Sequence, residues 1–399
     1  MLLFSGGQRS QTGTQRHTHS AYAYLNAAVR PDAAAIRDML TQWCSHYPLA
    51  HRTKLRTAFT SKRDRQHYGA FFELLLHEFF RQQKCYVDVV PTIVGLRKPP
   101  DFAIHHPVAG AFLLEATVAT ETSDRDHGAR AREAPVYEAL DRIVSPNFWL
   151  TVKVDGEPRT TPPTKRLIQE LTAWLAKEDY DAACARMAAG QHDQLPHCSW
   201  EHEGWQLRFQ AVPKGPNLRG RPDRRTVAMR TPRFAVRGLT AEALRAAIIE
   251  KATRYGRPSL PYVIAVGVPH RHVAHEMLLD AVFGQSGVLV SLDAIGNVRS
   301  TTPRRRGPAA WVWPEQPQNT RVSAVLVVHG ADPWNFATGH VEVLHNPFAT
   351  HPLPLLPRIA TCRQGPEDHE GHHHGESLRT LLGLPHEWPP PFTPFALSL

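Results

Sequence analysis

The stretch DRQHYGAFFELLLHEFFRQQKCYVDVVPTIVGLRKPPDFAIHHPVAGAFLLEATVA, residues 64–119, decides the fold of this 399-residue chain. Its first third has no Pro and repeats apolar side chains at helical spacing, which predicts a helix over 65–83. Residues 86–94, 100–104 and 111–119 are rich in β-branched and aromatic types, which predicts three short strands. A helix followed directly by three strands indicates a compact α/β unit.

The same pattern continues to residue 157. We expect a helix from about 133 to 143, then a strand at 148–154 that is closed by a turn at Asp155-Gly156. The chain then divides, by our prediction, into a disordered start with a helical segment (1–60), a first α/β unit (61–157), a further α/β portion (164–355) and an irregular Pro- and His-rich tail (356–399). The further portion either extends the same sheet or stands apart.

The charge of the chain favours a polyanionic partner. The net charge is +9, and nine of the 46 basic residues are Lys, which leaves 37 Arg. A guanidinium group makes bidentate contacts to phosphate, although a GC-rich genome would also raise the Arg content. The residues that we expect to bind nucleic acid are Arg219, Arg221, Arg224 and Arg225 in one segment and Arg304, Arg305 and Arg306 in another. The alternative is that both segments are solvated loops.

Cysteines and apolar runs exclude several classes of protein. The five cysteines are scattered and form no CxxC pair, which argues against a disulfide scaffold or a zinc ribbon and fits a reducing cytosol. The N-terminus does not resemble a secretory signal, and no apolar run approaches the roughly 20 residues that span a bilayer. We therefore expect a cytoplasmic protein without membrane contact. P-loop, GxGxxG and GxSxG motifs are also absent from the sequence.

Three acidic residues carry the candidate chemistry. Asp101 follows Pro100, and Glu115 comes fourteen residues later, inside the apolar run AFLLEATVA. A buried carboxylate costs several kcal/mol unless it has a partner, and a bound cation would offset that cost. Two hairpin-related strands can bring Asp101 and Glu115 together, and such oxygen ligands suit Mg²⁺. Glu73 falls at the border of the apolar face of the predicted helix, from which it can reach the sheet.

This array resembles the PD-(D/E)XK nuclease superfamily, which includes restriction endonucleases, resolvases and repair nucleases. The resemblance covers residues 65–155 and lies in Glu73, Pro100-Asp101 and Glu115-Ala116-Thr117 on a helix, three strands, a helix and a strand. It implies a restriction endonuclease-like core, a mixed sheet flanked by helices. It also implies Mg²⁺ or Mn²⁺ held by Asp101 and Glu115 with Glu73 as helix partner. The implied activity is phosphodiester hydrolysis of DNA in bacterial restriction, phage defence or repair, by a homodimer or with a partner protein.

One position departs from the family pattern. Thr117 stands where the family usually has Lys, the residue that orients the attacking water and stabilises developing charge. Lys98 or Lys153 could replace that Lys, or a second metal ion that involves Glu73 could do its work. Thr117 would then orient the nucleophile. A third alternative is a catalytically degenerate module that binds DNA or a protein partner without cutting, and a fourth is an interaction protein without nucleic acid.

Each acidic residue also has a purely structural interpretation. Asp101 could start a turn, Glu115 could form an ion pair with Arg97 or Arg132, and Glu73 could pair with His77 or Arg81 on its helix. We interpret Lys251, which precedes a buried strand, as a surface residue. The run His369, His372, His373 and His374 could bind transition metals loosely, without the Cys partners of a zinc finger.

Overall fold

The chain forms two compact units in the computed structural model. The structure describes residues 3–13, 15–96, 98–119, 124–220, 226–231, 240–269, 273–293, 295, 298–312, 316–364, 370–373 and 375–390. Unit 1 comprises 1–14, 20–120 and 239–399, and unit 2 comprises 15–19 and 121–238. Unit 2 is therefore inserted into the sequence of unit 1. Within the described part of the chain, no helix is both long and apolar enough to cross a membrane.

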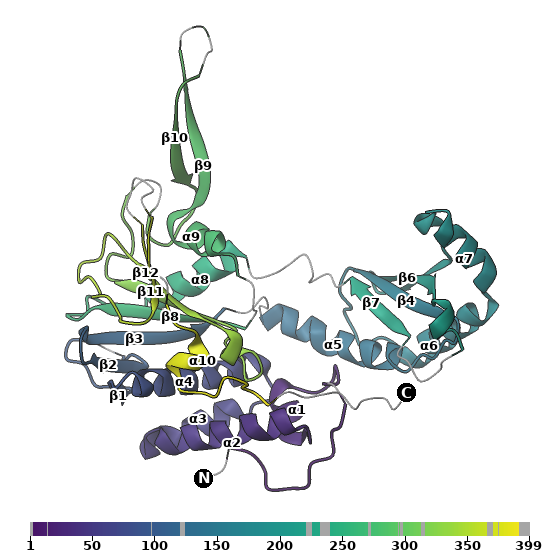
Figure 1. The fold of residues 1–399 in the computed structure, drawn as a ribbon, viewed down its shortest axis with the longest axis horizontal. Helices are drawn as coiled ribbons and strands as arrows, with labels where there is room; N and C mark the ends of the chain where they lie inside the picture. The colour runs from purple at the N-terminus through teal and green to yellow at the C-terminus, as the bar shows by residue number, and fades with distance from the viewer. Residues whose placement is uncertain are drawn as a thin grey trace. The chain divides into compact units, whose positions relative to one another are not determined.

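Unit 1 is built on a mixed eight-stranded sheet in the order β1-β2-β3-β8-β11-β12-β13-β14 (Figure 1). The strands are β1 (Tyr86–Val89), β2 (Phe102–His106), β3 (Gly110–Val118), β8 (Tyr262–Val268), β11 (Ala324–His329), β12 (Val341–His345), β13 (Ala360–Gln364) and β14 (Glu370–His373). The first three strands form an antiparallel meander, whereas β8 runs parallel to both β3 and β11. The parallel pair β3–β8 places two strands that are distant in sequence at the centre of the sheet.

Helices cover both faces of this sheet. One face is covered by α4 (Asp64–Gln82), on which α1 (Ala21–Ala27), α2 (Pro31–His46) and α3 (Arg52–Phe59) pack, and by α10 (Leu378–Leu381) with the short turn η4 (Phe336–Thr338). The short turn η1 (Leu49–His51) connects α2 to α3. The other face packs against α8 (Ala241–Ala252) and α9 (His275–Phe283). Side chains alternate along a strand, so Leu114 of β3 faces α4 whereas Leu113 faces α8. Glu115 therefore points to the α8 side.

Helix α4 is positioned by close packing against a glycine of the sheet. Phe71, Phe72 and Leu75 are buried on its apolar face. A Cβ atom at Gly267 of β8 would lie 2.9 Å from the ring of Phe72, so only glycine allows this approach without a shift. This contact places the helix that carries Glu73 against the centre of the sheet.

A separate two-stranded hairpin follows α9 and projects away from the large sheet of unit 1 (Figure 1). Its strands are β9 (Gln285–Leu292) and β10 (Val298–Arg306), and they pair antiparallel. At its base, Arg305 contacts Asp280 at 3.0 Å and Glu276 at 2.7 Å. These ion pairs tie the hairpin to α9.

Unit 2 is a small α/β unit with its own apolar core. Its sheet has the order β5-β6-β4-β7, formed by β4 (Phe148–Asp155), β5 (His197–His202), β6 (Trp205–Pro213) and β7 (Val227–Thr231). The remaining elements are α5 (Asp124–Leu140), α6 (Thr164–Lys177), α7 (Tyr180–Ala188), η2 (His192–Gln194) and η3 (Pro216–Leu218). The predicted turn after β4 is present, and its Gly156 has a φ of +79°, which favours glycine.

The structure confirms an α/β chain with a mixed sheet flanked by helices, but it divides the chain differently from the prediction. The strand predicted at 148–154 does not complete the first unit. It forms β4, which pairs with β6 and β7 in unit 2, and the strand beside β3 is β8. A parallel strand pair needs a long crossover connection, and here that connection contains residues 121–238 of unit 2 followed by α8. The unit 61–157 and the portion 164–355 are therefore each split between the two observed units.

The two ends of the chain also differ from expectation. Leu3 and Phe4 are 2% and 8% exposed and pack into the core of unit 1, although a disordered start was predicted. The tail after 356, predicted to be irregular, contributes β13, β14 and α10 to unit 1. Residues 391–399 lie outside the described residues. Short apolar runs at the ends gain order because a large sheet is available to pack against.

Candidate active site

The site is centred on Glu115, a fully buried carboxylate in the middle of β3. Its Oε1 atom lies 2.8 Å from Nζ of Lys251 and 2.5 Å from Nη1 of Arg254. Its Oε2 atom lies 2.5 Å from the hydroxyl of Tyr255 and accepts from the N–H of Asp101 at 3.3 Å. Two cations and two neutral donors therefore compensate the burial of one negative charge.

The end of helix α8 supplies three of these four donors. Lys251 lies in the last turn of α8, and Arg254 and Tyr255 follow Thr253, the C-cap residue of this helix. The hydroxyl of Tyr262, at the start of β8, donates to the carbonyl of Lys251 at 3.0 Å and so holds the helix end over the sheet. The side chain of Lys251 is 13% exposed, so the ion pair is largely shielded from solvent. Shielding strengthens this pair relative to one on the surface.

Asp101 stands beside Glu115 at the edge of the β2–β3 hairpin. The hairpin register aligns Phe102 with Leu114, so the backbone of Asp101 lies opposite that of Glu115. Oδ2 of Asp101 accepts the N–H of Ala116 at 2.8 Å. The pKa of Asp101 is raised, first by burial and then by the negative charge of Glu115. These two effects outweigh the backbone hydrogen bond, which lowers the pKa.

Glu73 of α4 is the third carboxyl group near the sheet. Burial, followed by repulsion from Asp101, raises its pKa to about 7. Burial, and then the negative charges of Glu73 and Asp101, also raise the pKa of the Tyr47 hydroxyl at the end of α2. Among the described residues, no hydrogen bond or ion pair reaches the Glu73 carboxyl. It is thus held in a position where its ionised form is unfavourable.

The charges at this site are unevenly distributed. Both cations, Lys251 and Arg254, contact Glu115, whereas Asp101 and Glu73 have raised pKa values. A divalent cation bound to oxygen ligands would favour the ionised form of both carboxyls. A donor set of carboxylates suits Mg²⁺ or Mn²⁺, with the remaining coordination positions taken by water and phosphate. The chemical type of these side chains therefore suits such an ion, although the three carboxyl groups do not all lie within 4.8 Å of one another.

Neither Lys98 nor Lys153, the lysines predicted to replace the family lysine, lies beside Glu115. Lys98 is exposed in the loop before β2, and Lys153 is exposed on β4 of unit 2. Lys251, interpreted as a surface residue, is the one that contacts Glu115. Lys251, Arg254 and Tyr255 are three and four residues apart, the spacing of one helix face, and this pattern was the available signal. Thr117 lies on the same face of β3 as Glu115 and is half-buried.

The ion pairs of Glu115 with Arg132 and of Glu73 with Arg81 do not form among the described residues. Nε of Arg132 donates to the carbonyl of Pro158, and Arg97 lies outside the described residues. Arg81 binds Glu78 at 2.7 Å rather than Glu73. Asp101 lies in a bend, as a turn residue would, but its carboxyl group caps the N–H of Ala116 on the neighbouring strand.

The basic residues predicted to bind nucleic acid have different surroundings. Arg221, Arg224 and Arg225 lie outside the described residues, and of Arg304 only the backbone in β10 is described. Arg305 is 11% exposed in its ion pairs with α9, so it holds the hairpin rather than offering a free guanidinium. Arg306 is exposed.

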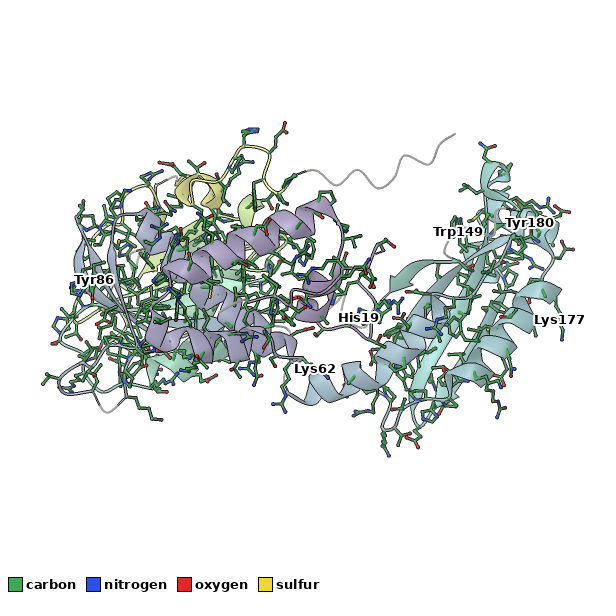
Figure 2. The ribbon with its side chains drawn as sticks, turned by 90° about the horizontal axis from the view of Figure 1, so that it is seen from below. His19, Lys62, Tyr86, Trp149, Lys177 and Tyr180 are labelled. Carbon is green, nitrogen blue, oxygen red and sulfur yellow. The ribbon has the colours of Figure 1, made fainter. Side chains whose placement is uncertain are left out.

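Arg219 belongs to an aromatic corner of unit 2. Its guanidinium lies 4.0 Å above the ring of Tyr180, and Nζ of Lys214 lies 4.6 Å from the ring of Trp149. Tyr180 also donates to the carbonyl of Lys214 at 2.7 Å. Figure 2 labels Trp149 and Tyr180 in unit 2. Arg219 is therefore a predicted nucleic-acid-binding residue whose side chain is stacked on an aromatic ring in the described structure.

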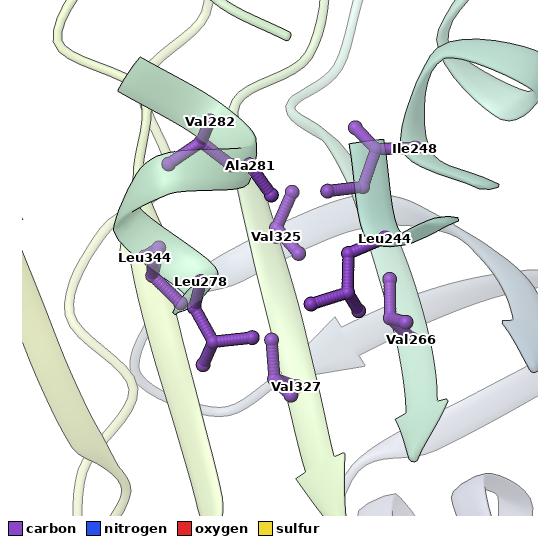
Figure 3. Close-up of a pocket in the computed structure, with 9 residues that line it drawn as sticks. All are labelled: Leu244, Ile248, Val266, Leu278, Ala281, Val282, Val325, Val327 and Leu344. Carbon is purple, nitrogen blue, oxygen red and sulfur yellow. The ribbon is translucent and has the colours of Figure 1, made fainter. Parts of the chain in front are cut away.

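A cavity lies between α8, α9 and the sheet (Figure 3). It is lined by Leu244, Ile248, Val266, Leu278, Ala281, Val282, Val325, Val327 and Leu344. Its volume of about 10 Å³ is close to the minimum for one water, and its lining carries no polar side chain. It is a packing gap in the core and not a substrate site.

Among the described residues, three potential metal ligands lie within 4.8 Å of one another at His329, His340 and Glu342. The three carboxyls around Glu115 do not form such a group. Comparison with protein-family models, with curated proteins and with solved structures found no match to this chain.

Proposed function

We propose that this protein is a metal-dependent nuclease that hydrolyses phosphodiester bonds of DNA at the site of Asp101, Glu115, Lys251 and Glu73. The observation that carries the proposal is the contact of Lys251 with the buried Glu115 at 2.8 Å, beside two carboxyls of raised pKa. Acidic metal ligands next to a shielded lysine form the set of groups that metal-assisted phosphodiester hydrolysis uses.

The order of elements supports the resemblance to the PD-(D/E)XK superfamily. Without the inserted unit 2, the chain runs α4, β1, β2, β3, α8, β8, which is the helix, three strands, helix and strand of the resemblance. The first three strands are antiparallel and the last is parallel to β3. The bacterial setting in restriction, phage defence or repair, and a homodimer or protein partner, rest on the resemblance alone.

Each residue of the site would have its own role in this reaction. Asp101 and Glu115 would hold the metal ion, and Glu73 would bind an attacking water or a second ion. The ion, when bound, supplies Lewis acidity and lowers the pKa of a coordinated water. Lys251 takes the role of the lysine that is missing at Thr117, and it fixes the orientation of Glu115 through its Nζ atom. Arg254 adds a second positive charge where negative charge develops on phosphate.

The charge of the site suits a phosphodiester substrate. With Asp101, Glu115 and Glu73 all ionised, three negative charges stand against the two cations Lys251 and Arg254, and the net charge of −1 repels phosphate. A divalent ion reverses the sign to a net positive charge of one, which matches the single negative charge of a phosphodiester. The basic chain as a whole, at +9, favours the approach of DNA in general.

A second candidate is a catalytically degenerate module that binds DNA or a protein partner. It is favoured by one observation: Glu115 already accepts from Lys251, Arg254, Tyr255 and the Asp101 N–H, so it is satisfied without a metal ion. Binding of Mg²⁺ at Asp101 separates the two candidates, because only the nuclease requires it.

The test is cleavage of plasmid and linear DNA with Mg²⁺ or Mn²⁺ by the full chain. We expect cutting by the wild type, loss of cutting in Asp101→Asn, and a fall of about 10²- to 10³-fold in Lys251→Met, the usual cost of one charge-stabilising group. Lys98→Met is the matched control, since Lys98 is exposed. Lys251→Arg retains the charge and should restore part of the rate.

Two outcomes would overturn the proposal. If the wild type binds DNA in a salt-dependent manner but neither binds Mg²⁺ nor cuts, the degenerate module is correct. If Lys98→Met loses activity while a folded Lys251→Met retains it, the assignment of Lys251 is wrong. Circular dichroism of each variant shows whether it is folded.

A further inference from the structure

A second group of potential ligands lies where β11 ends and β12 begins. His329 is the last residue of β11, and its N–H donates to the carbonyl of His340 at 3.0 Å. His340 directly precedes β12, and Glu342 lies two residues further on the same face of the sheet. Antiparallel pairing therefore brings the three side chains together, and their ligand atoms lie within 4.8 Å of one another.

The two imidazoles and the carboxylate are in direct contact. Nε2 of His329 lies 2.9 Å from Oε1 of Glu342, and the rings of His329 and His340 are stacked with centroids 3.9 Å apart. His329 is 1% exposed, and its Nδ1 atom has no hydrogen-bond partner among the described residues. A buried polar atom without a partner costs about 1–3 kcal/mol, so a ligand for Nδ1 of His329 would stabilise the fold.

A third histidine orients the carboxylate from outside the group. His275, the first residue of α9, places Nδ1 3.0 Å from Oε2 of Glu342. This contact directs Oε1 of Glu342 towards His329. Metal-binding side chains are commonly held in this way by a hydrogen bond to their second polar atom, which fixes their orientation.

We propose that His329, His340 and Glu342 bind one divalent transition-metal ion, of which Zn²⁺ is the best match, with His275 as a positioning residue. Two imidazoles and one carboxylate are a ligand set that suits Zn²⁺ and is unlike the all-oxygen set preferred by Mg²⁺. Three protein ligands leave a fourth position for water, and the exposed His340 gives access from solvent. The site shares no residue with the one around Glu115, so it does not depend on the proposed nuclease activity.

An ion bound at this site would also affect the stability of the fold, because of where its ligands lie. The segment 330–339 connects β11 to β12, and His329 and His340 stand at its two ends. An ion bound to both would clamp the base of this connection, which contains η4 and packs Phe336 into the core. Bound metal would then raise the stability of unit 1 by mass action.

The test is titration of the chelator-treated full chain with Co²⁺, whose visible absorption intensifies in a four-coordinate site, followed by displacement with Zn²⁺. Excess Mg²⁺ is present to occupy an all-oxygen site. We expect one equivalent of Co²⁺ to bind the wild type, and binding to be lost in His340→Gln and Glu342→Gln. His275→Gln should weaken it by about 10- to 100-fold. His351→Gln, at an exposed histidine of the same unit, is the matched control and should bind as the wild type does.

The run His369, His372, His373 and His374 could itself hold Co²⁺, so the titration is repeated in a chain where these four are Gln. Binding that persists there, and that disappears when His340→Gln is added, supports the proposal. Loss of binding in the four-Gln chain, or binding that is unchanged in His340→Gln, overturns it. The proposal is also overturned if the wild type binds neither Co²⁺ nor Zn²⁺. His340 is exposed, so its replacement should leave the fold intact even if Glu342→Gln does not.

Discussion

Replacement of Glu73 by Gln should stabilise the metal-free protein at alkaline pH. The pKa of Glu73 is raised from 4.5 to about 7 by burial and by Asp101. The folded state therefore retains a proton that the unfolded state has lost, and the free energy of unfolding falls as pH rises from about 4.5 to about 7. Gln resembles the protonated side chain and does not titrate, so the variant should escape this loss.

The expected magnitude follows from the size of the pKa shift. A shift of about 2.5 units, at 1.36 kcal/mol per unit, corresponds to about 3 kcal/mol at pH 8.5. At pH 5 the same calculation gives less than about 1 kcal/mol, because Glu73 is then protonated in the folded state. Such a residue, which destabilises the fold in its ionised form, is typical of functional sites.

The assay is urea-induced unfolding in a chelator at pH 5 and pH 8.5. Unfolding is monitored by hydrogen exchange of peptides from α4 and β3, so that only the unfolding of unit 1 is measured. Glu78→Gln is the matched control on the same helix. Burial tends to raise the pKa of Glu78, but hydrogen bonds from Arg81, His46 and Gln82 outweigh it and lower the pKa. That variant should lose about 1–3 kcal/mol at pH 8.5. The reasoning is refuted if Glu73→Gln is no more stable than the wild type at pH 8.5.

Three further predictions concern the same unit. Affinity for Mg²⁺ should fall as pH drops through the raised pKa of Asp101, because this proposed ligand must lose its proton to bind the ion; titration calorimetry that finds no pH dependence would contradict this. Tyr255→Phe removes a 2.5 Å hydrogen bond to the buried Glu115 and should cost about 1.5–3 kcal/mol of unfolding free energy, measured in urea. Gly267→Ala should cost about 1–3 kcal/mol by pressing on Phe72, whereas Gly256→Ala, with no atom near its Cβ, should not; equal midpoints for the two variants would exclude the packing argument.

Local patterns in the sequence predict much of the first half of unit 1. The helix expected at 65–83 is α4 (Asp64–Gln82), and the strands expected around 86, 100 and 111 are β1, β2 and β3. Helical and strand periodicity depend on neighbours within a few residues, and hairpin pairing needs only a short connection. Asp101 and Glu115 are joined by such a hairpin, so their proximity follows from the same short-range rules.

The sequence by itself thus determined which carboxylates share a hairpin, but only the tertiary structure decided what lies opposite them. Lys251 contacts Glu115 across 136 residues of sequence, and β8 rather than the strand at 148–154 pairs with β3. No periodicity identifies the partner of a buried parallel strand, because many apolar strands could take that place. That choice depends on which crossover packs best over the whole sheet. It is this packing that brings the end of α8 to the candidate site.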